Sequence, residues 1–154
     1  MIDTPHIAEC PAQAIACIRL TIPRAEIQKV MGPGIQEVMA VVAAQGIGPV
    51  GPWLTHHLRM DPAVFDFEIA VPVSRAVTPV GRVEAGELRA TRVSRTVYRG
   101  GYEGLGDAWG QHMKWIAEQG LTPAADLWEV YTKGPESSPD PSAWCTELNR
   151  PLLR

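Results

Sequence analysis

Residues 43–49 read Ala-Ala-Gln-Gly-Ile-Gly-Pro, and residues 117–123 read Ala-Glu-Gln-Gly-Leu-Thr-Pro. The matching positions keep one constant offset; they are Ala43, Gln45, Gly46 and Pro49 in the first stretch and Ala117, Gln119, Gly120 and Pro123 in the second. Further along, Phe-Glu-Ile-Ala-Val-Pro-Val at 67–73 corresponds to Thr-Glu-Leu-Asn-Arg-Pro-Leu at 146–152. Such self-similarity indicates two copies of one module of roughly 70 residues, a period too long for a solenoid.

The two copies predict one domain over residues 1–154, with module one over about 12–75 and module two over about 82–153. Each copy has the pattern of a strand, a helix and two further strands, because apolar residues first alternate, then recur every three or four positions, then alternate again. In the first copy we expect strands at 14–21, 54–60 and 65–71 and a helix at 35–44; in the second, strands at 87–98, 127–132 and 143–148 and a helix at 102–119. Gly46 and Gly120 lie where left-handed helix caps belong. The order predicts an α+β fold, an antiparallel sheet with helices on one side.

Composition narrows the class of protein. Hydrophobic residues make up 45% and charged residues 20% of the 154 residues, as in ordinary globular domains. The net charge of −3 provides no basic surface, so we expect no direct nucleic-acid partner. The N-terminus lacks the pattern of a signal peptide, and the longest near-apolar stretch, 38–50, is too short to span a bilayer. We therefore expect a cytoplasmic protein without a membrane partner.

The sequence predicts neither a metal site nor a cofactor. The three cysteines, Cys10, Cys17 and Cys145, form no Cys-x-x-Cys pair and indicate reduced thiols in the cytoplasm. His56 and His57 are adjacent on an expected strand, so they point to opposite faces and cannot chelate one ion as a simple pair.

Two expected strands of the second copy carry the candidate functional residues. In Leu-Trp-Glu-Val-Tyr at 127–131, Trp128 and Val130 are apolar, so we expect them under the helices. Glu129 and Tyr131 then lie together on the opposite, helix-free face.

The next strand adds a second carboxylate to this picture. If its residues alternate as in the repeat-related strand at 65–71, Trp144, Thr146 and Leu148 lie under the helices. Glu147 and Cys145 then lie on the same face as Glu129. Glu68 is the repeat partner of Glu147. A tyrosine beside carboxylates is typical of the wall of an amphipathic pocket that favours a cationic ligand. The alternative interpretation is that this face of the sheet is exposed to solvent and its carboxylates are hydrated.

The stretches 96–105 (Thr-Val-Tyr-Arg-Gly-Gly-Tyr-Glu-Gly-Leu), 128–131 (Trp-Glu-Val-Tyr) and 48–52 (Gly-Pro-Val-Gly-Pro) stand in an order that resembles the GyrI-like effector-binding family. With 67–73 and the other shared positions, the resemblance covers roughly residues 12–153. It implies two βαββ (SHS2-like) modules related by a pseudo-twofold axis, with a ligand groove between them. Members are effector-binding halves of MerR-type and AraC-type transcription regulators or stand-alone bacterial proteins. This chain resembles the stand-alone members, because it has no room for a helix-turn-helix.

The resemblance also implies a ligand class and a central residue. Family members bind bulky, often cationic aromatic compounds, including multiple drugs, and the family's pocket glutamate matches Glu129. The family commonly has tyrosine on the first-copy strand where this chain has His56. The predicted ligand-binding set is listed here: Glu129, Tyr131, Glu147, Glu68, His56, Trp144, Tyr98 and Trp53.

Three functions remain open at this level. The first is binding of a small hydrophobic, cationic or neutral aromatic ligand, for sensing or sequestration, by a monomer or weak homodimer. The second is hydrolysis of reactive, cyclopropane-type genotoxic natural products, which some similar stand-alone members perform, with Glu129 as general base and Tyr131 as its catalytic partner. The third is a protein-interaction or inhibitor module.

Overall fold

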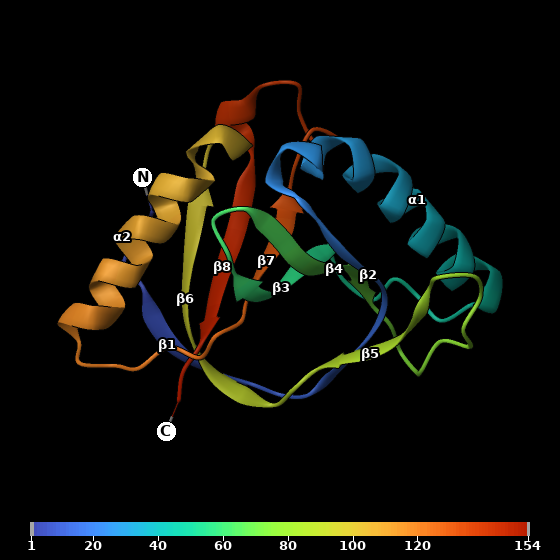
Figure 1. Ribbon diagram of the computed structural model, residues 1–154, viewed down its shortest axis with the longest axis horizontal. Coiled ribbons are helices and arrows are strands. Elements are labelled where there is room, and N and C mark those ends of the chain that lie inside the picture. Colours follow the sequence, from blue (N-terminus) through green and yellow to red (C-terminus); the bar gives the residue numbers. More distant parts are fainter. Residues whose placement is uncertain (1, 154) are drawn as a thin grey trace. The chain divides into compact units, whose positions relative to one another are not determined.

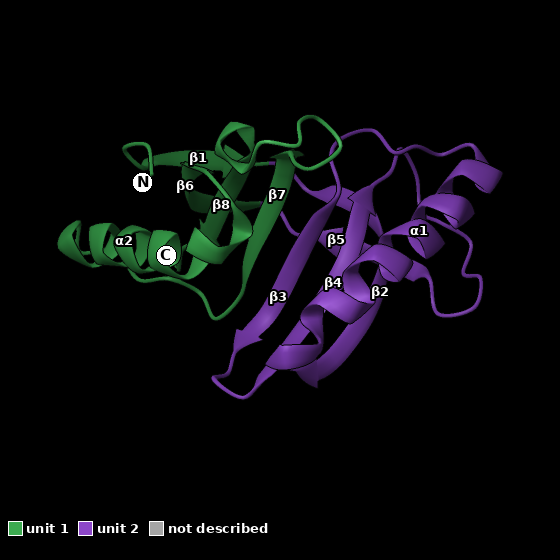
Figure 2. Ribbon diagram, turned by 90° about the horizontal axis from the view of Figure 1, so that it is seen from above, with its two compact units in different colours: residues 1–10, 91–154 green, residues 11–90 purple. Residues whose placement is uncertain are grey.

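The structure of the protein is a computed structural model in which residues 2–153 are described. The chain divides into two compact units, coloured separately in Figure 2. Unit 1 comprises Met1–Cys10 and Thr91–Arg154, and unit 2 comprises Pro11–Ala90. Each unit contributes four strands and one long helix and has its own cluster of buried apolar residues.

Unit 2 is a four-stranded antiparallel sheet with one long helix. Its elements are β2 (Gln13–Pro23), the short 3-10 helix η1 (Arg24–Glu26), α1 (Ile27–Gln45), β3 (Leu54–Met60), β4 (Val64–Pro72) and β5 (Glu84–Leu88) (Figure 1). The strand order is β3-β4-β2-β5. Val38 and Val42 of α1 pack on Ala16 and Ile18 of β2 and Val71 of β4, which fixes the helix-covered face.

Unit 1 repeats this arrangement with different residues. Its elements are β1 (His6–Cys10), β6 (Thr91–Arg99), the 3-10 helix η2 (Tyr102–Gly104), α2 (Leu105–Glu118), β7 (Leu127–Lys133), the 3-10 helix η3 (Pro141–Ala143) and β8 (Cys145–Pro151). The strand order is β1-β6-β8-β7, again antiparallel. Ala108 of α2 packs with Tyr98 of β6 and Leu148 of β8, and Leu105 and Trp109 border this cluster.

The prediction of an α+β fold with antiparallel strands is confirmed. In each unit the order along the chain is strand, helix, strand, strand, and the last of these strands lies between the other two. Gly46 and Gly120 adopt φ values of 66° and 70° after the two helices, as predicted for left-handed caps. A duplication as the origin of the two units stays a prediction.

Three elements differ most from the sequence expectation. The helix α1 begins at Ile27 instead of residue 35 and continues through Pro33, where one helical hydrogen bond is necessarily missing. The strand expected at 87–98 is two strands, β5 and β6, which belong to different units. The strand β1 was not expected, since its five residues are mostly exposed and show no apolar alternation. Among the described residues, neither α1 nor α2 has the length and hydropathy needed to cross a membrane.

Candidate ligand-binding site

The pairing of β7 with β8 decides which way the candidate residues point. Glu129 lies opposite Leu148, and Tyr131 lies opposite Thr146. Directly opposed residues of an antiparallel pair share a face, and Leu148 packs against Ala108 of α2. Glu129 and Tyr131 therefore lie on the helix-covered face of unit 1, and their predicted position on the helix-free face is wrong.

The apolar neighbours of Glu129 occupy the other face. Trp128 lies opposite Asn149, and Val130 lies opposite Glu147. The expectation failed because it assumed that a carboxylate would avoid the helix, whereas a buried carboxylate is tolerated where donors satisfy it. Glu147 and Glu129 consequently point to opposite faces of one sheet, although the sequence pattern had placed them together.

Two neutral donors hold the Glu129 carboxylate, whose residue is only 8% exposed. The Trp109 indole Nε1–H of α2 donates to Oε2 at 2.6 Å, and the Tyr131 hydroxyl donates to Oε1 at 2.7 Å. Trp109 reaches the carboxylate because it faces the sheet from the first half of α2. The sequence analysis did not single out Trp109 as a site residue; the available signal was its indole N–H, which needs a partner when it is buried.

Further aromatic rings continue from Tyr131. Tyr102 of η2 meets Tyr131 edge-on, with ring centroids 5.8 Å apart, and lies 5.0 Å from the ring of Trp144. The Trp144 indole donates to the Ser138 carbonyl oxygen at 2.8 Å, which anchors the ring at the end of the loop before β8. We call Tyr102, Trp109, Tyr131 and Trp144, with Glu129 among them, the aromatic cluster. Burial, Glu136 and Glu129 raise the pKa of Tyr102, so its hydroxyl stays protonated.

A buried histidine, His112, packs against the Trp109 ring of the aromatic cluster. The ring of His112 stacks on Trp109 with centroids 5.4 Å apart and planes 24° apart. Its Nε2 lies 2.8 Å from the Ser94 hydroxyl, and the residue is fully buried. Burial, with a contribution from Arg150, lowers the pKa of His112 to about 4, so the ring under Trp109 is neutral at physiological pH.

The buried His112 predicts a loss of stability in mild acid. An unfolded histidine takes up a proton near pH 6.5, whereas the folded ring resists it until about pH 4, so stability falls as the pH drops through this window. The shift corresponds to about 3 kcal/mol of unfolding free energy. Urea titrations between pH 7.5 and 4 should show this loss in the wild-type protein. The part of this loss that is due to His112 should be absent in His112→Gln. If the unfolding free energy falls equally steeply with pH in both proteins, the low pKa of His112 is contradicted.

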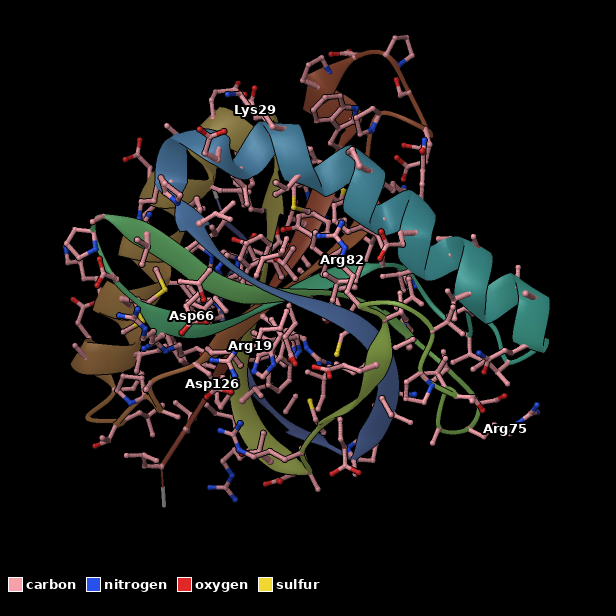
Figure 3. All side chains as sticks on the ribbon, turned by 45° about the vertical axis from the view of Figure 1, so that its right-hand side comes forward. Arg19, Lys29, Asp66, Arg75, Arg82 and Asp126 are labelled. Carbon is pink, nitrogen blue, oxygen red and sulfur yellow. The ribbon has the colours of Figure 1, made fainter. Side chains whose placement is uncertain are left out.

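A second carboxylate, Glu68, lies on the helix-free face of unit 2, as predicted. The His56 Nδ1 is 2.8 Å from Glu68 Oε1, and the Cys17 thiol donates to Oε2 at 3.5 Å. Burial raises the pKa of Glu68, but the hydrogen bonds and charges of its partners outweigh this and leave the pKa below its usual value. On the same face, Arg19 and Asp66 form an ion pair at 3.3 Å (Figure 3). The carboxylate of Glu68 is therefore ionised and already has partners within its own unit.

The remaining predicted residues do not join the aromatic cluster. Glu147, on the other face of unit 1, accepts from Asn149 Nδ2 at 3.1 Å and lies 3.4 Å from Arg95 Nε. The Tyr98 hydroxyl is used within the fold, where it donates to the Gly101 carbonyl oxygen at 2.8 Å. Trp53 packs against the core of unit 2. The structure thus brings Glu129, Tyr131 and Trp144 together, and separately pairs Glu68 with His56.

Metal ligation finds no support in residues 2–153, where no three His, Cys, Asp or Glu side chains are arranged to hold an ion. His56 lies opposite Glu68 and His57 opposite Phe67, so the adjacent histidines point to opposite faces as expected. The aromatic cluster offers a buried carboxylate that is contacted by an indole N–H and a phenol hydroxyl, with further aromatic rings beside them.

Comparison with known proteins extends this description. The family model for the GyrI-like small molecule binding domain matches residues 3–152. No protein with a curated description matches the sequence.

Solved structures share the fold at low sequence identity. The EcmrR C-terminal domain superposes with a TM-score of 0.85 and 20% identity, covering 98% of both chains. The structure of EcmrR in complex with DNA contains a longer EcmrR chain, and the protein described here matches 57% of that length. SAV2435 bound to tetraphenylphosphonium has a TM-score of 0.65 and 12% identity, covering 98% of this chain and 94% of that one. A hydrolase from Listeria innocua has a TM-score of 0.66 and 13% identity, covering 97% and 91%.

Proposed function

Because this chain belongs to the family of GyrI-like small-molecule-binding domains, we propose that it binds bulky aromatic molecules, cationic or neutral, at the aromatic cluster of unit 1. Glu129 is the group that selects positive charge. The biological role that follows is sensing or sequestration of hydrophobic drugs or toxins.

The observation that carries this proposal is the balance of charge around Glu129. The carboxylate is buried, and both of its donors, Trp109 and Tyr131, are neutral. Among residues 2–153, no arginine, lysine or histidine forms an ion pair with it, whereas Glu68 and Glu147 each lie beside a basic side chain. A buried anion without a cationic partner attracts a desolvated cation, and an aromatic ring adds to that attraction wherever its face meets the cation.

A matched pair of ligands tests the selection of charge. Tetraphenylphosphonium, the compound bound by SAV2435, and tetraphenylborate have nearly the same shape and opposite charges. Like charges brought together in a buried site cost several kcal/mol, so we expect the phosphonium to bind at least about 100-fold more tightly than the borate. Isothermal titration calorimetry, with quenching of tryptophan fluorescence as a second readout, measures both affinities. Equal affinities, or tighter binding of the borate, would contradict a role for Glu129 in charge selection.

Hydrolysis is the second candidate function, and a specific contact favours it. A carboxylate beside a phenol hydroxyl, as in Glu129 with Tyr131 at 2.7 Å, is a suitable general base with a neighbouring proton donor. The substrates would be strained, cyclopropane-bearing electrophiles: water gives its proton to Glu129 as its oxygen bonds to a ring carbon, and the electron pair of the ring C–C bond that breaks takes up the proton of the Tyr131 hydroxyl. Product formation from such a compound, lost in Glu129→Gln, would favour the hydrolase; reversible binding without product would favour sensing or sequestration.

A further inference from the structure

Three buried polar atoms of the described residues have no hydrogen-bond partner, and all three belong to unit 1. They are the Tyr102 hydroxyl oxygen, the Thr146 hydroxyl oxygen and His112 Nδ1. Tyr102 meets Tyr131 edge-on, Thr146 lies opposite Tyr131 in the sheet, and His112 stacks on Trp109. Each of these residues therefore adjoins a ring that holds the Glu129 carboxylate.

The confinement of all three atoms to one unit calls for an explanation. The large majority of buried polar atoms have partners, because leaving one unsatisfied costs about 1–3 kcal/mol. Among residues 13–88, which make up the strands and helix of unit 2, no such atom occurs. Unsatisfied atoms on residues that adjoin the rings of one site are expected where a ligand supplies the missing bonds.

The Tyr102 hydroxyl has the clearest role of the three. A Cβ atom added at Gly134 would lie only 2.7 Å from the hydroxyl oxygen, so glycine at this position leaves the hydroxyl its space. Because the phenol stays protonated, it offers a hydrogen-bond donor. The ring that carries this hydroxyl contacts both Tyr131 and Trp144, and the hydroxyl itself lies beside Gly134, just after β7.

We propose that the ligand of the aromatic cluster is an aromatic cation that also carries a neutral hydrogen-bond acceptor, which the Tyr102 hydroxyl binds while the positive charge lies at Glu129. The acceptor is an oxygen or an uncharged nitrogen on an otherwise apolar body. This inference rests on the proposed function and narrows its ligand class, since a hydrocarbon cation satisfies Glu129 but leaves Tyr102 without a partner.

Ligands of the same shape distinguish the hydrogen bond to Tyr102 from the charge interaction with Glu129. In the three isomers of triphenyl(pyridyl)phosphonium, one ring CH of tetraphenylphosphonium is replaced by a neutral nitrogen, with little change of shape or charge. For the wild-type protein we expect one isomer to bind about tenfold more tightly than tetraphenylphosphonium, as one added hydrogen bond allows. Calorimetric titration of all four compounds gives the ratio.

Variants of the protein test whether the tighter binding of the pyridyl isomer depends on the Tyr102 hydroxyl. Tyr102→Phe should abolish the preference for the pyridyl isomer, so that this isomer and tetraphenylphosphonium bind with equal affinity, because it removes the hydroxyl that donates to the ring nitrogen. Gly134→Ala retains the hydroxyl but displaces it, and should reduce the same preference. Glu129→Gln should weaken the pyridyl isomer and tetraphenylphosphonium by equal factors.

The outcomes distinguish this inference from the proposed function. Equal binding of all four cations by the wild-type protein would overturn the acceptor inference and leave charge selection intact. A Tyr102→Phe variant that weakens every cation equally would make Tyr102 a packing residue and also overturn it. Failure of the wild-type protein to bind any of the four compounds would overturn the proposed function and this inference together.

Discussion

Glu129→Gln should lower the affinity for tetraphenylphosphonium by about 30-fold or more. Glutamine keeps the size of the side chain and one acceptor oxygen, but it removes the only charge in the aromatic cluster. Truncating one charge of a buried, desolvated pair costs about 2–5 kcal/mol. Titration calorimetry on the wild-type protein and the variant measures the loss, and the preference over tetraphenylborate should shrink with it.

Matched variants show whether the effect belongs to the site. Glu118→Gln changes the charge by the same amount at an exposed position on α2, so it should leave the affinity within about twofold. Glu147→Gln removes the carboxylate that faces away from α2 in the same sheet. A loss as large as that of Glu129→Gln in either variant would mean that the overall charge of the protein, or the other face of the sheet, attracts the cation.

Phe67→Ala is expected to destabilise the protein by about 3–5 kcal/mol, the usual effect of deleting a buried phenyl ring. Phe67 is fully buried in the middle of β4. Its ring stacks on His57 at 5.3 Å and meets Phe65 edge-on at 6.1 Å, so its removal leaves a cavity that two neighbouring rings border.

Urea denaturation followed by circular dichroism measures this change in unfolding free energy. Met60→Ala, at the half-exposed end of β3, is the control and should change stability by no more than about 0.5 kcal/mol. A loss below about 1 kcal/mol in Phe67→Ala would contradict the close packing of this part of unit 2.

Local patterns in the sequence were sufficient for much of the fold. Gly46 and Gly120 marked both helix ends, because glycine adopts a left-handed conformation without steric cost. The alternation at 65–71 gave the correct faces of β4, with Phe67 toward the helix and Glu68 away from it. The repeat also indicated the order of strands and helix that both units share.

The candidate site was predictable only in part. The sequence identified Glu129 and Tyr131 as neighbours, since residues two apart on a strand share a face and lie within reach of each other. It did not identify Trp109 or Tyr102, because their contacts with Glu129 and Tyr131 depend on how the segment from η2 to α2 packs on the sheet.

Only the tertiary structure decided which face of β7 carries the site. Alternation shows which residues share a face of a strand, and in β4 the apolar set, which includes Phe67, is the one that faces the helix. In β7, Trp128 is 3% exposed and Glu129 is 8% exposed, so both faces are buried and hydrophobicity does not distinguish them. The hydrogen-bond register with β8 sets the direction instead, and it directs Glu129 toward α2, where the Trp109 indole N–H donates a hydrogen bond to its carboxylate.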